Sequence, residues 1–208
     1  MSSDTGLEEH QRWIGYLQPD GLVVSAQVLV DNQVYINRNS APLQATLQKY
    51  VVAHELADGE ETQRIADFKT FLTGFLRWPA ELLVGTEDAG EIPETLKIPL
   101  PEVSEILEPT YAFRNTNGAE SPWMLLLKEV PAGADLDSKD DSDWSVSQAQ
   151  RFERLLRDTQ VPIGLLTNKE VVRLVYAPRG KTRGALHSQW PPCWRSPADR
   201  LPRRLKNC

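Results

Sequence analysis

The pattern of apolar and polar positions divides the chain into a helical first part and an extended second part. Apolar residues recur at helical spacing in three early stretches: 7–17, 41–56 and 65–76. Trp78-Pro79 ends the last stretch, and residues 26–36 fit a helix or a strand equally well. This spacing predicts an all-helical amino-terminal part over residues 1–80.

Beyond an acidic linker that ends at Glu94, the pattern becomes extended. Short apolar and β-branched runs predict strands at five places: 95–100, 106–113, 123–130, 163–167 and 171–176. Residues 145–159 instead place Phe152, Leu155 and Leu156 on one face and predict a helix between the third and fourth strands. The sequence therefore predicts an α/β fold with one mixed sheet flanked by helices, sheet-rich over residues 95–178.

Charge separates the last residues from the rest of the chain. The net charge of the 208 residues is −6, but residues 186–208 contain five basic residues and one acidic residue. Residues 1–185 therefore carry −10, from 18 basic and 28 acidic residues. The last segment also holds four of the 15 prolines and both cysteines. We expect one domain over 1–185 and a disordered, basic, proline-rich tail over 186–208.

Several function classes lack their sequence signals. No apolar run is long enough to span a bilayer, and the start has no signal-peptide pattern, so we expect a cytoplasmic protein without a membrane partner. No phosphate-binding glycine loop and no G-x-S-x-G elbow occur. His54-Glu-Leu-Ala-Asp58 lacks the second histidine of a zinc protease, and three histidines with two tail cysteines predict no metal site.

Two charged groups have both a functional and an ordinary interpretation. The acidic stretch 135–143 offers Asp135, Asp137 and Asp143 as calcium ligands, but it lacks the central glycine and the final glutamate of an EF-hand loop, so a solvated loop is the alternative.

In the predicted helix, the spacing of Arg151, Arg154 and Arg157 places them along one face. They are candidates for binding DNA phosphates, or they form a solvated face with Glu153 and Asp158.

Three segments resemble one protein family. The three segments are Gln150-Arg-Phe-Glu-Arg-Leu-Leu-Arg-Asp-Thr-Gln-Val-Pro-Ile-Gly-Leu-Leu-Thr-Asn168 with Val172-Arg-Leu-Val-Tyr176, the opening Trp13 to Ser25, and Tyr35-Ile-Asn-Arg-Asn39. All three are similar to the amino-terminal region of large restriction-modification adenine methyltransferases. That family includes the methylases of DISARM-type phage-defence systems. Its amino-terminal domains look like the PD-(D/E)XK restriction-endonuclease fold, so the resemblance implies that fold for residues 10–185.

The resemblance also implies where nuclease chemistry would lie. The fold needs an Asp at one strand start, and an acid two positions before a Lys on the next strand, to hold a metal ion and orient water. Lys128 is in place, but Thr110 and Leu126 stand where the two carboxylates belong. Glu105 and Glu108 are weak substitutes, and so is Glu129, which strand alternation points away from Lys128.

Methyl transfer would need a further domain that binds S-adenosylmethionine. The Asn-Pro-Pro-aromatic motif of that domain is missing, since the single Pro-Pro pair follows Gln189-Trp190. We therefore expect a truncated amino-terminal module that uses no cofactor, with a tail translated in a shifted frame. Its expected role is DNA engagement, or assembly with other subunits of a defence system, without catalysis. An active metal-dependent DNA endonuclease and a protein-interaction module that binds no nucleic acid are the alternatives.

Overall fold

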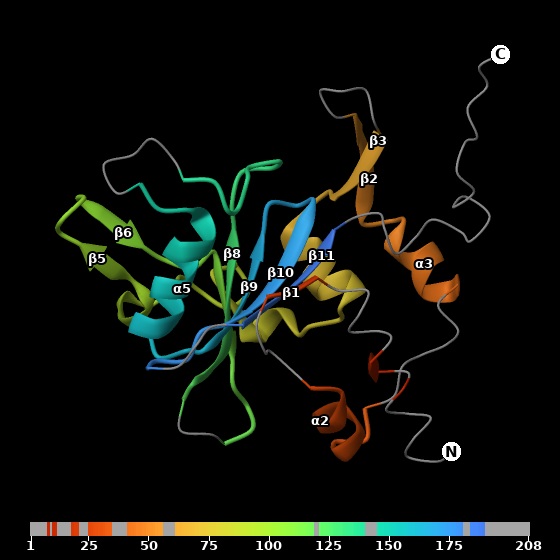
Figure 1. Ribbon diagram of the computed structural model, residues 1–208, viewed down its shortest axis with the longest axis horizontal. Helices are drawn as coiled ribbons and strands as arrows, with labels where there is room; N and C mark the ends of the chain where they lie inside the picture. The colour runs from red at the N-terminus through yellow and green to blue at the C-terminus, as the bar shows by residue number, and fades with distance from the viewer. Residues whose placement is uncertain are drawn as a thin grey trace.

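A seven-stranded mixed sheet forms the centre of the molecule (Figure 1). The computed structural model describes residues 8, 10–11, 18–20, 25–34, 41–55, 61–118, 121–139, 145–180 and 184–189. The sheet order is β1 (Gln18–Asp20), β11 (Gly184–Gln189), β10 (Val171–Tyr176), β9 (Ile163–Thr167), β8 (Trp123–Glu129), β7 (Tyr111–Arg114) and β4 (Leu83–Val84). The predicted α/β class with one mixed sheet is confirmed.

One parallel pair lies between two antiparallel hairpins. Strands β7 and β8 form the first hairpin, and β9 and β10 form the second, whereas β8 and β9 run parallel. A parallel pair needs a crossover connection, and helix α5 (Gln148–Asp158) supplies it. Ser147 caps α5 in a capping box with Gln150, which fixes where the helix begins. The predicted helix and the strands before and after it are confirmed here.

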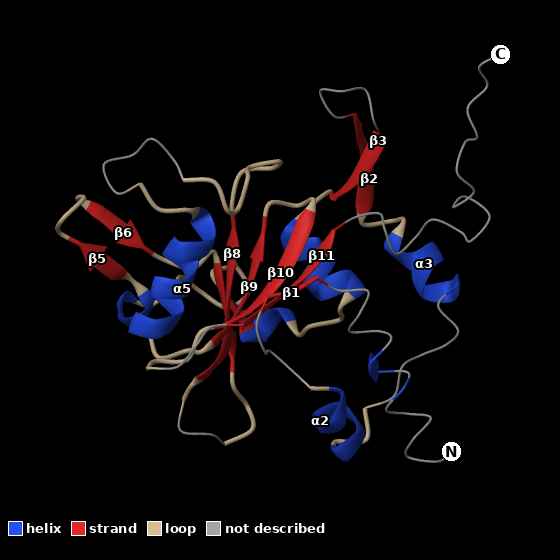
Figure 2. Ribbon diagram, in the orientation of Figure 1, coloured by secondary structure: helices blue, strands red, loops and turns tan. Residues whose placement is uncertain are grey.

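Helices cover both faces of the sheet (Figure 2). Helix α5 packs on one face, where Phe152, Leu155 and Leu156 bury against Leu126 and Leu166. On the opposite face, helix α4 (Phe68–Thr70) continues as the π-helix η1 (Phe71–Phe75), and both pack against Leu127 and Phe113. Asp67 caps α4 by accepting the Thr70 amide at 2.7 Å. Strand β8 is therefore buried on both faces, as expected for a central strand.

The expectation of an all-helical amino-terminal part is wrong. Helix α2 (Ala26–Asp31) and helix α3 (Ala41–Leu47) are short, and the chain then forms the antiparallel hairpin of β2 (Val51–Glu55) and β3 (Glu61–Ile65). The helical spacing of residues 41–56 therefore predicted a helix where the structure has strand β2. The β-branched pair Val51-Val52 favours a strand, and cross-strand pairing outweighs the helical spacing. Most of the helix expected over 7–17 lies outside the described residues.

The second part also departs from the expected boundaries. The expected linker contains the 3-10 helix η2 (Ala80–Leu82) and strand β4, and the strand expected over 95–100 begins instead as the 3-10 helix η3 (Glu94–Leu96). The strand expected over 106–113 is two strands, because Pro109 follows β6 (Glu105–Leu107), and β6 pairs with β5 (Ile98–Leu100) in a separate hairpin. That β5–β6 hairpin lies beside α5 in Figure 1.

Strand β11 crosses the boundary expected at residue 185. It pairs with β10 from Gly184 to Gln189 and with β1 on its other edge. The sheet thus extends into the first residues of the segment expected to be a tail, and the rest of that segment lies outside the described residues. Within the described ranges, no helix is long and apolar enough to cross a membrane.

Candidate functional site

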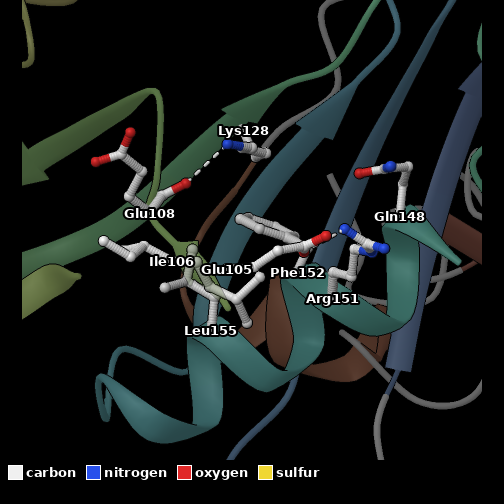
Figure 3. A pocket seen from close by; sticks show the side chains of 9 residues that line it. Glu105, Ile106, Glu108, Lys128, Gln148, Arg151, Phe152 and Leu155 are labelled. Carbon is white, nitrogen blue, oxygen red and sulfur yellow. Dashed lines mark hydrogen bonds and ion pairs between the residues drawn. The ribbon is translucent and has the colours of Figure 1, made fainter. Parts of the chain in front are cut away.

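A small pocket opens where β6, β8 and α5 meet (Figure 3). Its volume is about 120 Å³. Lys128 comes from β8, and Gln148 and Arg151 come from the first turn of α5, while Glu105 and Glu108 come from β6 and the residue after it. Ligand pockets for whole small molecules usually occupy roughly 300–1,000 Å³. This pocket therefore has room for a single small group, such as a phosphate, but not for a whole nucleotide.

Lys128 lies partly buried in the pocket. Its Nζ donates a hydrogen bond to the backbone carbonyl of Glu108 at 2.9 Å, and Figure 3 shows the Glu108 carboxylate directed away from the ammonium. Burial lowers the pKa of Lys128, and the charge of Glu108 only partly opposes this shift. The charged form of a partly desolvated ammonium that donates to a neutral oxygen is stabilised by a nearby anion. The position therefore favours contact with an anionic group.

The two carboxylate positions of the nuclease pattern cannot bind a divalent cation. Thr110 immediately precedes β7, and its Oγ1 accepts the Glu129 amide at 3.0 Å. Leu126 is fully buried in the core beneath α5. Neither side chain supplies the anionic oxygen that a hard cation requires. Among the described residues, no group of three or more His, Cys, Asp or Glu residues could hold a metal ion.

The three acids considered as substitutes for the metal-binding carboxylates lie on two different faces of the sheet. Glu108 and Glu105 line its pocket, but Glu129 lies on the opposite face of β8 and forms an ion pair with Lys169 at 3.1 Å. Strand alternation predicted that separation. Glu105 is itself 2.7 Å from Arg151, so its charge is already paired. Of the weak catalytic candidates Lys128, Glu108 and Glu129, the structure brings only the first two together.

Each of the three candidate DNA-binding arginines has a carboxylate partner. Arg151 pairs with Glu105 at 2.7 Å. Arg154 lies 2.8 Å from Glu102 and 3.5 Å from Asp158. Arg157 lies 3.8 Å from Glu153. These contacts favour the interpretation of a charge-balanced face, and two of them tie α5 to the β5–β6 hairpin. A DNA phosphate would have to displace a carboxylate at each position.

The described part of the acidic stretch 135–143 does not point its carboxylates at a common centre. Asp135 accepts the amides of Asp137 and Ser138 at 2.8 and 3.2 Å and so shapes a turn. Asp137 pairs with Arg173 of β10. Because these carboxylates already accept hydrogen bonds from backbone amides and from Arg173, they are poor calcium ligands. Asp143 lies outside the described residues.

Comparison with protein-family models, with curated proteins and with solved structures finds no match for the chain.

The sequence did not predict three residues of this face: Gln148, Ile106 and the buried Arg173. The period of α5 places Gln148 one turn before Phe152, which is the signal that could have found it. No sequence signal places Ile106 beside α5, since that contact depends on how the β5–β6 hairpin folds back.

Proposed function

We propose that this chain is a nuclease-like module of the kind found at the amino terminus of restriction-modification and phage-defence adenine methyltransferases. In this proposal it engages DNA or partner subunits of a defence complex and does not cut DNA. The order of elements supports the proposal, because an antiparallel hairpin, a crossover helix and a parallel strand follow one another as β7, β8, α5 and β9. This is the arrangement expected for the restriction-endonuclease-like fold named by the resemblance.

One observation carries the proposal. Lys128, which the resemblance puts at the lysine position of the nuclease pattern, lines a pocket, whereas Thr110 and Leu126 stand where that pattern has its carboxylates. Of the two carboxylates that line the pocket, Glu105 is paired with Arg151 and that of Glu108 is directed away from Lys128, which favours binding of a phosphate over its metal-dependent hydrolysis. Because the three arginines of α5 are ion-paired and residues 1–185 are acidic, DNA contact would be weak and would depend chiefly on Lys128.

Plasmid incubated with the protein and Mg²⁺ or Mn²⁺ tests for catalysis. We expect no cleavage, because neither metal has its carboxylate ligands. Cleavage that disappears in Lys128→Ala would overturn the proposal in favour of the metal-dependent endonuclease.

Fluorescence anisotropy with a labelled duplex then tests DNA engagement. If Lys128 supplies the main phosphate contact, the logarithm of the binding constant falls with the logarithm of salt concentration with a slope of about −1. Lys128→Ala should abolish this binding, whereas Lys97→Ala, which removes a lysine ion-paired with Glu94, should leave it unchanged. Failure of every variant to bind at low salt would remove DNA engagement from the proposal and leave protein assembly.

A further inference from the structure

One edge of strand β6 has backbone groups that no strand pairs with. In the described part of the chain β6 pairs only with β5, and Ile106 lies opposite Pro99. Proline has no N–H to donate, so this pair is a non-hydrogen-bonded one, and the pairs on either side of it form the ladder hydrogen bonds. The N–H and C=O of Ile106 therefore point away from β5, toward an edge where no described strand lies. Such an edge is a template for an added strand.

This free edge of β6 leads to Lys128. Backbone groups two residues apart on a strand point to the same side, and the carbonyl of Glu108, two residues after Ile106, accepts Lys128 Nζ at 2.9 Å (Figure 3). Ile106 and Glu108 both line the pocket, and Ile106 is 61% exposed, so the edge is open to solvent. An ammonium has three donors, and among the described residues Lys128 uses one of them, on Glu108. A segment that pairs with Ile106 therefore meets a cation with donors to spare.

Only one kind of chain end suits that position. The Glu108 carbonyl already accepts Lys128, so a paired strand finds its next acceptor occupied beyond Ile106. An antiparallel strand would bring an amino terminus, with its positive charge, to the ammonium. A strand parallel to β6 brings a carboxylate instead, which stabilises the charged lysine. The free edge and the cation together therefore select a carboxyl terminus.

The acids beside Lys128 leave room for a further carboxylate. Glu105 is 2.7 Å from Arg151, so its charge is paired. The carboxylate of Glu108 is directed away from Lys128 in Figure 3. Gln148, the first residue of α5, adds a neutral amide to the lining, and the amino-terminal end of a helix favours negative charge.

The rest of the pocket suits a small apolar side chain. Leu107, Phe152 and Leu155 are buried and form the apolar part of the lining. The volume is about 120 Å³. A cavity of roughly 150 Å³ holds a benzene molecule, so the smaller pocket has space for a carboxylate and a methyl group. Alanine is therefore the best-fitting last residue.

We propose that this pocket binds the carboxyl terminus of a partner protein, which adds to the free edge of β6 as a parallel strand. The terminal carboxylate accepts from Lys128 Nζ. The Ile106 N–H donates to the carbonyl of the third residue from the end, and the Ile106 carbonyl accepts the amide of the last residue. The inference rests on the partner-assembly part of the proposed function, and it gives Lys128 a peptide carboxylate as its ligand in place of a DNA phosphate.

A short peptide that ends in Val-Thr-Val-Ala and carries a fluorophore at its amino end tests the site on the full chain by anisotropy. Amidation of the peptide carboxylate should weaken binding at least tenfold, because a partly desolvated ammonium loses its counter-charge, and Lys128→Met should weaken it by a similar factor. Lys69→Met is the matched control and should change affinity less than twofold, since Lys69 lies on α4 and pairs with Asp88. Equal affinity of the acid and amide peptides, or no saturable binding of the acid peptide, would overturn the proposal.

Methyl groups on the peptide backbone test the strand pairing without changing the protein. N-methylation of the last residue removes the donor to the Ile106 carbonyl and should weaken binding at least tenfold. N-methylation of the penultimate residue is the matched control, because in parallel pairing that amide points away from β6, and its effect should be much smaller. Equal losses at the two positions would overturn the pairing with β6.

A labelled duplex, measured in the same buffer, separates failure of this inference from failure of the proposed function. Duplex binding that depends on Lys128, without peptide binding, would overturn the carboxyl-terminus site and leave DNA engagement in place. Peptide binding without duplex binding would support the site and remove DNA engagement from the proposed function. Binding of neither would count against both.

Discussion

Lys128 and Glu129 are neighbours on β8, yet they meet opposite surroundings. Lys128 lies on the face covered by α5, where its ammonium bonds a neutral carbonyl and burial lowers its pKa. Glu129 lies on the other face, where Lys169 holds its carboxylate at 3.1 Å. A charge that is paired inside the fold has little left to offer a ligand. The chemistry available at this end of the sheet is therefore on the α5 face.

The same contrast divides the core residues of β8. Leu126 faces α5 and Leu127 faces α4 and η1, and both are fully buried. On the α5 face, however, Leu126 stands where the proposed nuclease-like pattern would place an acid. The core under α5 therefore fills the space that a metal-binding carboxylate would need. Substitutions on the two faces of the sheet should accordingly differ in their effects.

Placing a carboxylate at Leu126 should destabilise the fold severely. Leu126→Glu places a charge in the core under α5 with no partner, and an uncompensated buried charge costs about 3–5 kcal/mol. Leu126→Met, which conserves volume, should cost less than about 1.5 kcal/mol. Urea unfolding measures both. A Leu126→Glu variant as stable as the unmodified chain would show that the core under α5 can accommodate a carboxyl group.

Two glycines give a smaller test of how tightly each face is packed. A Cβ on Gly164, under α5, would lie 2.5 Å from the Phe152 ring and 2.9 Å from the Leu126 carbonyl. For a Cβ on Gly74, in η1, the nearest atoms belong to the end of the Tyr50 side chain, at 2.6 Å. Overpacking costs about 1–3 kcal/mol, and Gly164→Ala should reach the upper end because backbone cannot move aside. Gly74→Ala should cost less, since the end of the Tyr50 side chain can shift. Equal losses in urea unfolding would contradict the difference.

The local elements of the α5 face could be predicted from the sequence. The apolar period of α5 and the β-branched runs of β9 and β10 are local signals, and each predicted the correct element. The hairpin of β2 and β3 was missed because Val51 also fits the apolar period of the preceding helix. Helical spacing and strand propensity conflicted there, and cross-strand pairing decided the outcome.

The candidate site could be predicted only in part. Lys128 was a candidate because the family resemblance implies a lysine at that point of the strand. The pairing of Arg151 with Glu105 was missed, since it joins residues 46 positions apart. The fork between Arg173 and Asp137 was missed for the same reason, with 36 positions between the partners. Contacts of this kind depend on how β6 and the acidic stretch fold back, and no local pattern encodes that.

The smallest expected effect is the pH dependence that Lys128 contributes. Because burial lowers its pKa in the folded state from the unfolded value of 10.5, the unfolded chain binds more protons between those two values, and stability rises with pH in that window. Lys128→Met removes the buried charge, so its stability relative to the unmodified chain should be highest near neutral pH and should fall as pH approaches 10.5.

Lys97 should show the opposite dependence of stability on pH, because Glu94 raises its pKa and favours the charged form. Lys97→Met should therefore be less stable than the unmodified chain below pH 10.5, and the deficit should shrink above it. Urea unfolding of the two variants across this range compares them directly, and parallel pH profiles would mean that Lys128 is as well solvated as Lys97.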